Sequence, residues 1–302
     1  MKKKITMFFT VLLAALNVAA QNADTYYIKA PHFVLPLIEK WIREYKKVEP
    51  QTNLMIAKSA SNKNESSLDI QLSEESSTPL LESTTVYFGA YAILPVTTKN
   101  SEADKLFAKK ELNQKKLKSL LFINDDLDEQ QSKQDNTYDK IVLYTGSSKL
   151  SVSNPYALYF GKDASSFKGR KIVGDDAFLN VAIQKDPNGL AFNAVPNLYD
   201  IQSRRLKNNL SIVPLNFSKE QLAAIPSLDN LISVLESTNV EGVPVEKIGF
   251  SYHNNNDAIN RFVSWVLTDG QAYNHQYGLL QLKAKDAIRE ANKAKTLLTA
   301  QK

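Results

Sequence analysis

The sequence contains no cysteine and only three histidines. The lack of cysteine excludes disulfides, cysteine-ligated zinc, iron–sulfur clusters and a thiol nucleophile. The histidines, at positions 32, 253 and 275, are too widely separated for any two to lie within helical ligand spacing. We therefore expect neither a bound metal nor a cofactor.

The usual catalytic sequence patterns are missing as well. The chain has no G-x-S-x-G, H-E-x-x-H, P-loop or G-x-G-x-x-G pattern. Residues 165–168 (S-S-F-K) fit S-x-x-K, but no K-T-G segment accompanies them. The pairs Asp125–Asp126 and Asp175–Asp176 are better explained by a polar loop and a helix start than by acid–base chemistry. From the sequence we therefore expect that the protein is not an enzyme.

The N-terminal apolar run, residues 5–16, is shorter than the roughly 20 residues that a membrane span needs. Three lysines at positions 2–4 precede it and V-A-A at 18–20 ends it, which is typical of a cleaved signal peptide at 1–20. No cysteine follows, so lipid attachment there is excluded. Cleavage lowers the formal net charge from +5 to +2, since it removes three lysines. We expect a periplasmic protein that does not bind nucleic acid.

At 302 residues the chain is long enough for two lobes of roughly 100–150 residues each. Apolar spacing and turn residues predict alternating strands and helices. The predicted strands are 25–29, 53–58, 86–96, 141–144, 190–193, 212–215 and 248–252. The predicted helices are 34–45, 101–118, one capped by Asp175, one opened by a Ser218/Gln221 capping box, 257–267 and a tail helix from 283. This order favours an α/β fold with mostly parallel sheets and ligand sites at strand-to-helix turns.

Five segments occur in an order that resembles a known family. They are I-K-A-P-H-F-V-L-P-L-I-E-K-W (28–41), L-D-I-Q-L-S-E (68–74), the apolar run 86–96 ending in L-P-V, K-L-S-V-S-N (149–154), and F-V-S-W-V-L-T-D-G-Q followed by G-L-L-Q-L (262–282). Together they are similar to the phosphate-binding proteins that serve ABC uptake transporters. The resemblance spans nearly all of the chain after the signal peptide.

The resemblance implies an α/β fold of the two-lobed type II periplasmic binding protein class. Mixed or parallel sheets flanked by helices are expected, with two crossover hinge strands between the lobes. Lobe one would comprise residues 24–94 plus 197–302, and lobe two residues 95–196. The lobes of such proteins close on an oxyanion.

Two turns of lobe one carry ligand residues in this family. His32 falls where the family has a threonine, and the backbone amides of His32 and Phe33 are expected to donate to the anion because a helix begins there. Ser73 matches a family serine, and Glu74 falls at a family aspartate. Such a carboxylate accepts the proton of hydrogen phosphate and repels sulfate, which carries none. His32 is equally compatible with an exposed residue that has no ligand role.

A third turn, in lobe two, departs from the family pattern. Lys149 replaces an arginine and keeps its charge but not its bidentate geometry. Ser151 stands at an aspartate that orients that arginine, Ser153 matches a family serine, and Asn154 replaces a glycine. The following residue is a proline, which has no amide to donate. The alternative is that this turn only caps the next helix and that Lys149 is a solvated surface charge.

The sequence therefore predicts an exported, monomeric solute-binding protein that captures phosphate or a similar oxyanion between its lobes. Its partner would be an inner-membrane ABC permease. The alternative is a binding-protein fold that has lost its anion ligand and acts as a sensory or protein-interaction module. The altered third turn is the feature that favours this alternative.

Overall fold

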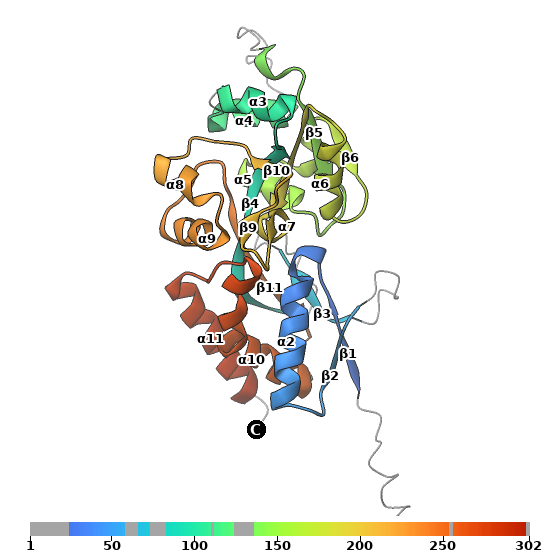
Figure 1. Cartoon of the computed structure of the whole chain (residues 1–302). Helices are drawn as coiled ribbons and strands as arrows, with labels where there is room; N and C mark the ends of the chain where they lie inside the picture. The colour runs from blue at the N-terminus through green and yellow to red at the C-terminus, as the bar shows by residue number, and fades with distance from the viewer. Residues whose placement is uncertain are drawn as a thin grey trace, which may run out of the picture.

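The computed structural model describes residues 24–57, 66–72, 83–109, 112–123, 136–253 and 256–299. The predicted signal peptide lies outside these residues. Figure 1 shows two halves, one above the other, joined by the long strand β4 (Thr84–Thr98). None of the helices described is both long and apolar enough to cross a membrane.

The lower half contains both ends of the described chain (Figure 1). Its elements are β1 (Thr25–Lys29), η1 (His32–Val34), α2 (Leu35–Val48), β2 (Asn53–Ile56), β3 (Ser66–Gln71), β11 (Val245–Tyr252), α10 (Asp257–Thr268), η5 (Gly270–Tyr273), η6 (His275–Tyr277) and α11 (Ala284–Thr299). Helix α2 forms because its apolar residues recur every three or four positions, and it buries Leu37, Ile38, Trp41 and Tyr45. Trp41 packs edge-on against Phe88 of β4.

The upper half contains the middle of the chain. Its elements are α3 (Glu102–Lys109), α4 (Gln114–Leu121), η3 (Asn136–Tyr138), β5 (Val142–Gly146), α5 (Ser153–Tyr159), η4 (Ala164–Ser166), β6 (Arg170–Ile172), α6 (Ala177–Gln184), β7 (Gly189–Ala194), α7 (Val195–Leu198), β8 (Tyr199–Asp200), β9 (Arg205–Leu206), β10 (Leu210–Ile212), α8 (Lys219–Ala224) and α9 (Leu228–Ser237). Its aromatic side chains pack together, with Tyr156 stacked on Phe192 and Phe122 stacked on Phe167, and they belong to one buried apolar core that extends through both halves. The predicted Ser218/Gln221 capping box is confirmed at the start of α8.

Nine strands within the described residues form one sheet in the order β2-β1-β3-β11-β4-β7-β5-β6, with β10 also paired to β4. The outer pairs β1–β2, β1–β3, β5–β6 and β5–β7 are parallel. The central pairs β3–β11, β11–β4, β4–β7 and β4–β10 are antiparallel. The prediction of mostly parallel sheets is therefore wrong at the centre, where β4 runs from one half into the other and neighbouring strands return beside it.

Local features of β4 explain how it serves both halves. Its first residues pair with β11 and its last residues pair with β7 and β10. Gly89 lies at an irregularity in the pairing with β11. A Cβ at Gly89 would come within 3.0 Å of the Leu280 carbonyl oxygen, so glycine allows the 274–280 segment to approach the strand.

The predicted lobes and the two halves differ in one stretch. The boundary at residue 94/95 falls within β4, where the pairing passes from β11 to β7. Residues 197–237 were predicted for lobe one, but their elements lie in the upper half in Figure 1. They lie there because β10 pairs with Val96–Thr98. Which residues move together as a lobe stays a prediction.

Candidate functional site

The first predicted turn, between β1 and α2, donates one backbone amide, that of His32, to the upper half. Val34 donates to the Pro31 carbonyl (3.2 Å) and Leu35 donates to the His32 carbonyl, so both amides are used within the turn. The His32 amide instead donates to Asp175 Oδ2 of the upper half at 3.1 Å. The His32 side chain is exposed, whereas Phe33 is buried and packs against Tyr91 of β4. One of the two predicted donors thus already binds a carboxylate.

The third predicted turn, between β5 and α5, uses its donors internally. The Val152 amide donates to Asp176 Oδ2 (2.7 Å), and the Ser153 amide donates to Ser151 Oγ (3.1 Å). The Asn154 amide donates to the Ser151 carbonyl (3.2 Å). Ser153 Oγ, which is fully buried, accepts from the Gly146 amide at 2.9 Å. The amides of residues 152–154 therefore have acceptors within the chain, although no side chain caps the start of α5.

Asp176 is the buried carboxylate at the centre of the site. Besides the Val152 amide, it accepts a hydrogen bond from Ser151 Oγ at 2.7 Å. Burial raises the pKa of Asp176 to about 6; the bonds from Ser151 and Val152 oppose this shift, and the neighbouring Asp175 charge adds to it. A Cβ on Gly146 would overlap both Ser151 Oγ and the Asp176 carboxylate, so glycine is needed behind the pair.

Asp175 connects the first turn to the start of α6. Its Oδ1 accepts from the Ala177 amide (2.8 Å) at the start of α6, while its Oδ2 accepts from His32. The sequence predicts Asp175 as the N-cap; in the structure the N-cap position is Asp176, and Asp175 supplies the side-chain bond to the helix start. The structure therefore brings His32, Ser151 and Ser153 together around this acidic pair.

A buried set of asparagines holds the acidic pair from behind. Asn193 Nδ2 donates to the Asp176 carbonyl (2.8 Å) and to Asn180 Oδ1 (3.2 Å). Asn193 Oδ1 accepts from Asn197 Nδ2 (2.8 Å), and the Asn197 carbonyl accepts from Lys207 Nζ (2.7 Å). Sequence reasoning missed these residues, because an amide side chain in a strand or turn carries no spacing signal. The adjacent acids at 175 and 176 were visible in the sequence but were assigned a structural role.

The remaining predicted residues lie differently. Lys149 is exposed, and its carbonyl, like that of Ser148, accepts from Asn154 Nδ2 at 3.1 Å. Asn154 therefore turns back onto its own loop. Ser73 and Glu74 lie outside the described residues. The preceding residue, Leu72, accepts a bond from Tyr91 Oη at 2.6 Å, and the Asp176 charge helps to raise the pKa of buried Tyr91, after burial itself and Glu246.

The arrangement can hold a negatively charged oxygen at two places, the His32 amide and the Ser151–Val152 turn. Backbone amides at a helix start and a hydroxyl are suitable donors for any oxyanion. In this structure, carboxylates of the chain itself, Asp175 and Asp176, accept from these donors. In the parts of the chain that the structure describes, no group of three or more acidic or histidine side chains is placed to hold a metal ion.

Several solved structures are similar to this chain over most of its length. A phosphate ABC transporter substrate-binding protein with bound phosphate from Clostridium perfringens has a TM-score of 0.54 at 16% identity, covering 86% of this chain and 100% of that one. An ABC-type phosphate transport receptor from Vibrio cholerae has a TM-score of 0.55 at 10% identity, with the same coverage. A full-length BenM mutant has a TM-score of 0.51 at 12% identity, covering 93% of this chain and 77% of that one.

No protein-family model matches the chain, and no curated protein matches its sequence. At these identities the similarity to solved structures shows the fold alone. The predicted fold class is confirmed: the chain has a mixed α/β fold with a curled sheet flanked by helices, as in type II periplasmic binding proteins. The resemblance to phosphate-binding proteins found in the sequence agrees with this fold.

Proposed function

We propose that this chain is an exported solute-binding protein that captures phosphate or a similar oxyanion between its two halves and delivers it to an inner-membrane ABC permease. The contact that supports this proposal is the bond from the His32 amide to Asp175 Oδ2 across the junction of the halves. It means that an amide expected to bind the anion is placed to donate to a charged oxygen from the opposite half. The proposal is a binding function, without catalysis.

Isothermal titration of the ligand-stripped protein with phosphate tests the proposal, with sulfate as the comparison anion. We expect one site per chain and a preference for phosphate. Heat from neither anion, in a protein that still unfolds cooperatively, would reject the oxyanion function.

Ser73 and Glu74 remain proposed ligands. A carboxylate beside a bound anion is tolerable only where a ligand proton lies between them, and hydrogen phosphate brings such a proton. Glu74→Gln should therefore narrow the preference for phosphate, mainly through a gain in sulfate binding. Equal preference in variant and parent would remove Glu74 from the site.

Lys149 is also a proposed ligand contact, although its side chain is exposed in the structure. If its ammonium group reaches the anion, Lys149→Ala should weaken binding by about 1.5–3 kcal/mol, the range for a charge-assisted hydrogen bond. Unchanged titration curves would place Lys149 on the solvated surface.

The proposed export is tested separately. Intact-mass measurement of protein secreted by a Gram-negative host should give a chain that begins at or near Gln21. Retention of the three lysines at positions 2–4 would contradict the signal peptide and the periplasmic location.

A second candidate function is a binding-protein fold that no longer takes an external anion and acts as a sensory or protein-interaction module. The observation that favours it is the third turn, where the Val152, Ser153 and Asn154 amides all have acceptors within the chain. A folded protein that binds neither phosphate nor sulfate would support this candidate over the first.

A further inference from the structure

Asp175 occupies an unusual position, because its carboxylate serves its own helix and the opposite half at the same time. Oδ1 accepts from Ala177 in the upper half, and Oδ2 accepts from His32 in the lower half, 143 residues away in sequence. The first contact fixes the direction of the carboxylate, and the second places it against a predicted anion donor.

The first turn has few donors to share. Pro31 has no N–H, and the amides of Val34 and Leu35 donate within the turn. The amides of His32 and Phe33 are then the donors that this turn can offer to a ligand. The Asp175 carboxylate takes one of them.

An anion from solution can replace Asp175 as the acceptor of the His32 amide. The hydrogen bond from His32 to Asp175 lies at the exposed surface, so a dissolved anion can reach the same amide. A carboxylate and an external anion cannot both accept from one amide at close range without like-charge repulsion, and the Asp176 carboxylate beside Asp175 adds to that repulsion. An external anion must therefore displace Asp175 from His32.

We propose that Asp175 determines how tightly the site binds an oxyanion, by acting as an internal anion that competes for the His32 amide. This inference rests on the proposed oxyanion-binding function. The apparent affinity falls by the fraction of time for which the amide is free, so occupancy of the amide for about nine-tenths of the time lowers it about ten-fold. The competition acts on any anion that needs this amide, so Asp175 limits phosphate and sulfate alike.

The test is a phosphate and sulfate titration of the full-length mature protein and of Asp175→Asn. Asparagine keeps an oxygen for the Ala177 amide, so the start of α6 is preserved, but it removes the competing charge. Asp163→Asn is the matched control, because Asp163 also accepts a backbone amide in a turn of the upper half, that of Ser165, and is exposed.

We expect Asp175→Asn to bind both anions about ten-fold more tightly than the parent, and Asp163→Asn to match the parent. Binding by Asp175→Asn alone, with none by the parent, would support the competition for the His32 amide but would reject anion capture as the function of the parent. If the parent binds phosphate and Asp175→Asn binds it equally or more weakly, the competition is rejected while the proposed function stands. If no variant binds either anion, both the proposed function and the competition are rejected.

Discussion

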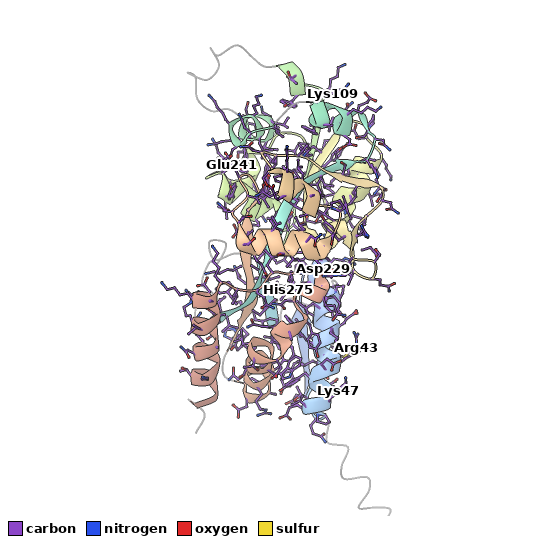
Figure 2. The ribbon with its side chains drawn as sticks, turned by 60° about the vertical axis from the view of Figure 1, so that its left-hand side comes forward. Arg43, Lys47, Lys109, Asp229, Glu241 and His275 are labelled. Carbon is purple, nitrogen blue, oxygen red and sulfur yellow. The ribbon has the colours of Figure 1, made fainter. Side chains whose placement is uncertain are left out.

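Two of the places where the described residues of the upper and lower halves meet are built very differently. At the first, Asp175 Oδ2 accepts from the His32 amide at the exposed surface. At the second, Arg204 pairs with Asp229 of α9 and donates to the carbonyls of Gln276 (2.7 Å) and His275 (2.9 Å) in the lower half. Figure 2 shows Asp229 and His275 near each other at the junction of the halves.

The Arg204 contact is reinforced by a second acidic residue. Glu236 Oε1 of α9 lies 2.8 Å from His275 Nε2 and accepts from the Gln281 amide at 2.7 Å. Arg204 itself has a positive φ of 59°, which is uncommon for a residue other than glycine and costs free energy. Several charge-assisted bonds offset that cost. Both contacts are at least partly exposed, but the Arg204 side chain has three acceptors where the His32 amide has one, so we expect the Arg204 connection to be harder to replace.

Asp176, which neighbours Asp175, and Asp229, which pairs with Arg204, also differ in their electrostatics. Burial raises the pKa of Asp176, whereas the hydrogen bond from Arg204 lowers the pKa of Asp229. A buried carboxylate with a raised pKa favours folding most when it is protonated, and an Arg-paired carboxylate favours folding most when it is charged. The candidate site therefore holds a destabilising charge at Asp176 near neutral pH, while the charge of Asp229 favours folding through its bond with Arg204.

Gly146→Ala should give the largest effect, because the new Cβ overlaps Ser151 Oγ and the Asp176 carboxylate in a buried site. We expect a loss of about 3 kcal/mol or more in the free energy of unfolding, at the upper end for overpacking. Urea denaturation of variant and parent measures it. A loss below about 1 kcal/mol would mean that Asp175 and Asp176 can shift to accept the new Cβ. The site would then be no more rigid than the Arg204 contact.

Asp176→Asn should change how stability depends on pH. The pKa of the Asp176 carboxyl is 3.8 in the unfolded chain and about 6 in the folded protein. Its contribution to the free energy of unfolding is therefore fully present below about pH 3.8 and is lost as the pH rises through about 6. At 1.36 kcal/mol per unit the change is at most about 3 kcal/mol. Urea denaturation across this pH range should show that the free energy of unfolding of the parent, relative to that of Asp176→Asn, falls as the pH rises.

Asp229→Asn is the control for that measurement, because the pKa of Asp229 is lowered by Arg204. Its stabilising contribution is present above the unfolded pKa of 3.8 and is lost as pH falls through the folded pKa. The two variants should therefore differ from the parent with opposite pH trends. Parallel trends would contradict the electrostatic contrast between the two places.

Arg204→Lys should destabilise the protein by about 2 kcal/mol, since a lysine keeps the charge but cannot reach Asp229 and two carbonyls together. The same urea experiment measures it, with the exposed Arg205→Lys as the control. Equal stability of both variants would show that the charge alone matters and that Arg204 does not clamp the halves.

Asp175→Ala should have the smallest effect on stability, about 1 kcal/mol, because it removes the exposed bond to His32 and the bond to Ala177. Its effect on shape should be clearer. We expect small-angle X-ray scattering of the anion-free protein to give a larger radius of gyration than for the parent. An unchanged radius would mean that Asp175 does not help to hold the halves together.

Parts of the site could be predicted because they depend on neighbouring residues. The start of a helix predicts that the His32 amide is a donor to an anion; the structure shows it donating to the Asp175 carboxylate, and binding of an external anion stays a prediction. The acceptor was not predictable, because Asp175 is far away in the chain and its role depends on how the halves meet. The direction of the Asn154 side chain, which turns back onto the carbonyls of residues 148 and 149, was likewise not visible in the sequence.

The fold shows the same division. Helix α2, the capping box of α8 and most strand positions could be predicted from the sequence, because apolar periodicity and capping are short-range effects. The sequence did not determine the antiparallel centre of the sheet, because strand direction depends on pairing between distant segments. That the His32 and Val152 amides meet carboxylates of the chain itself depends on the tertiary structure, because an amide binds whichever charged oxygen the packing brings to it.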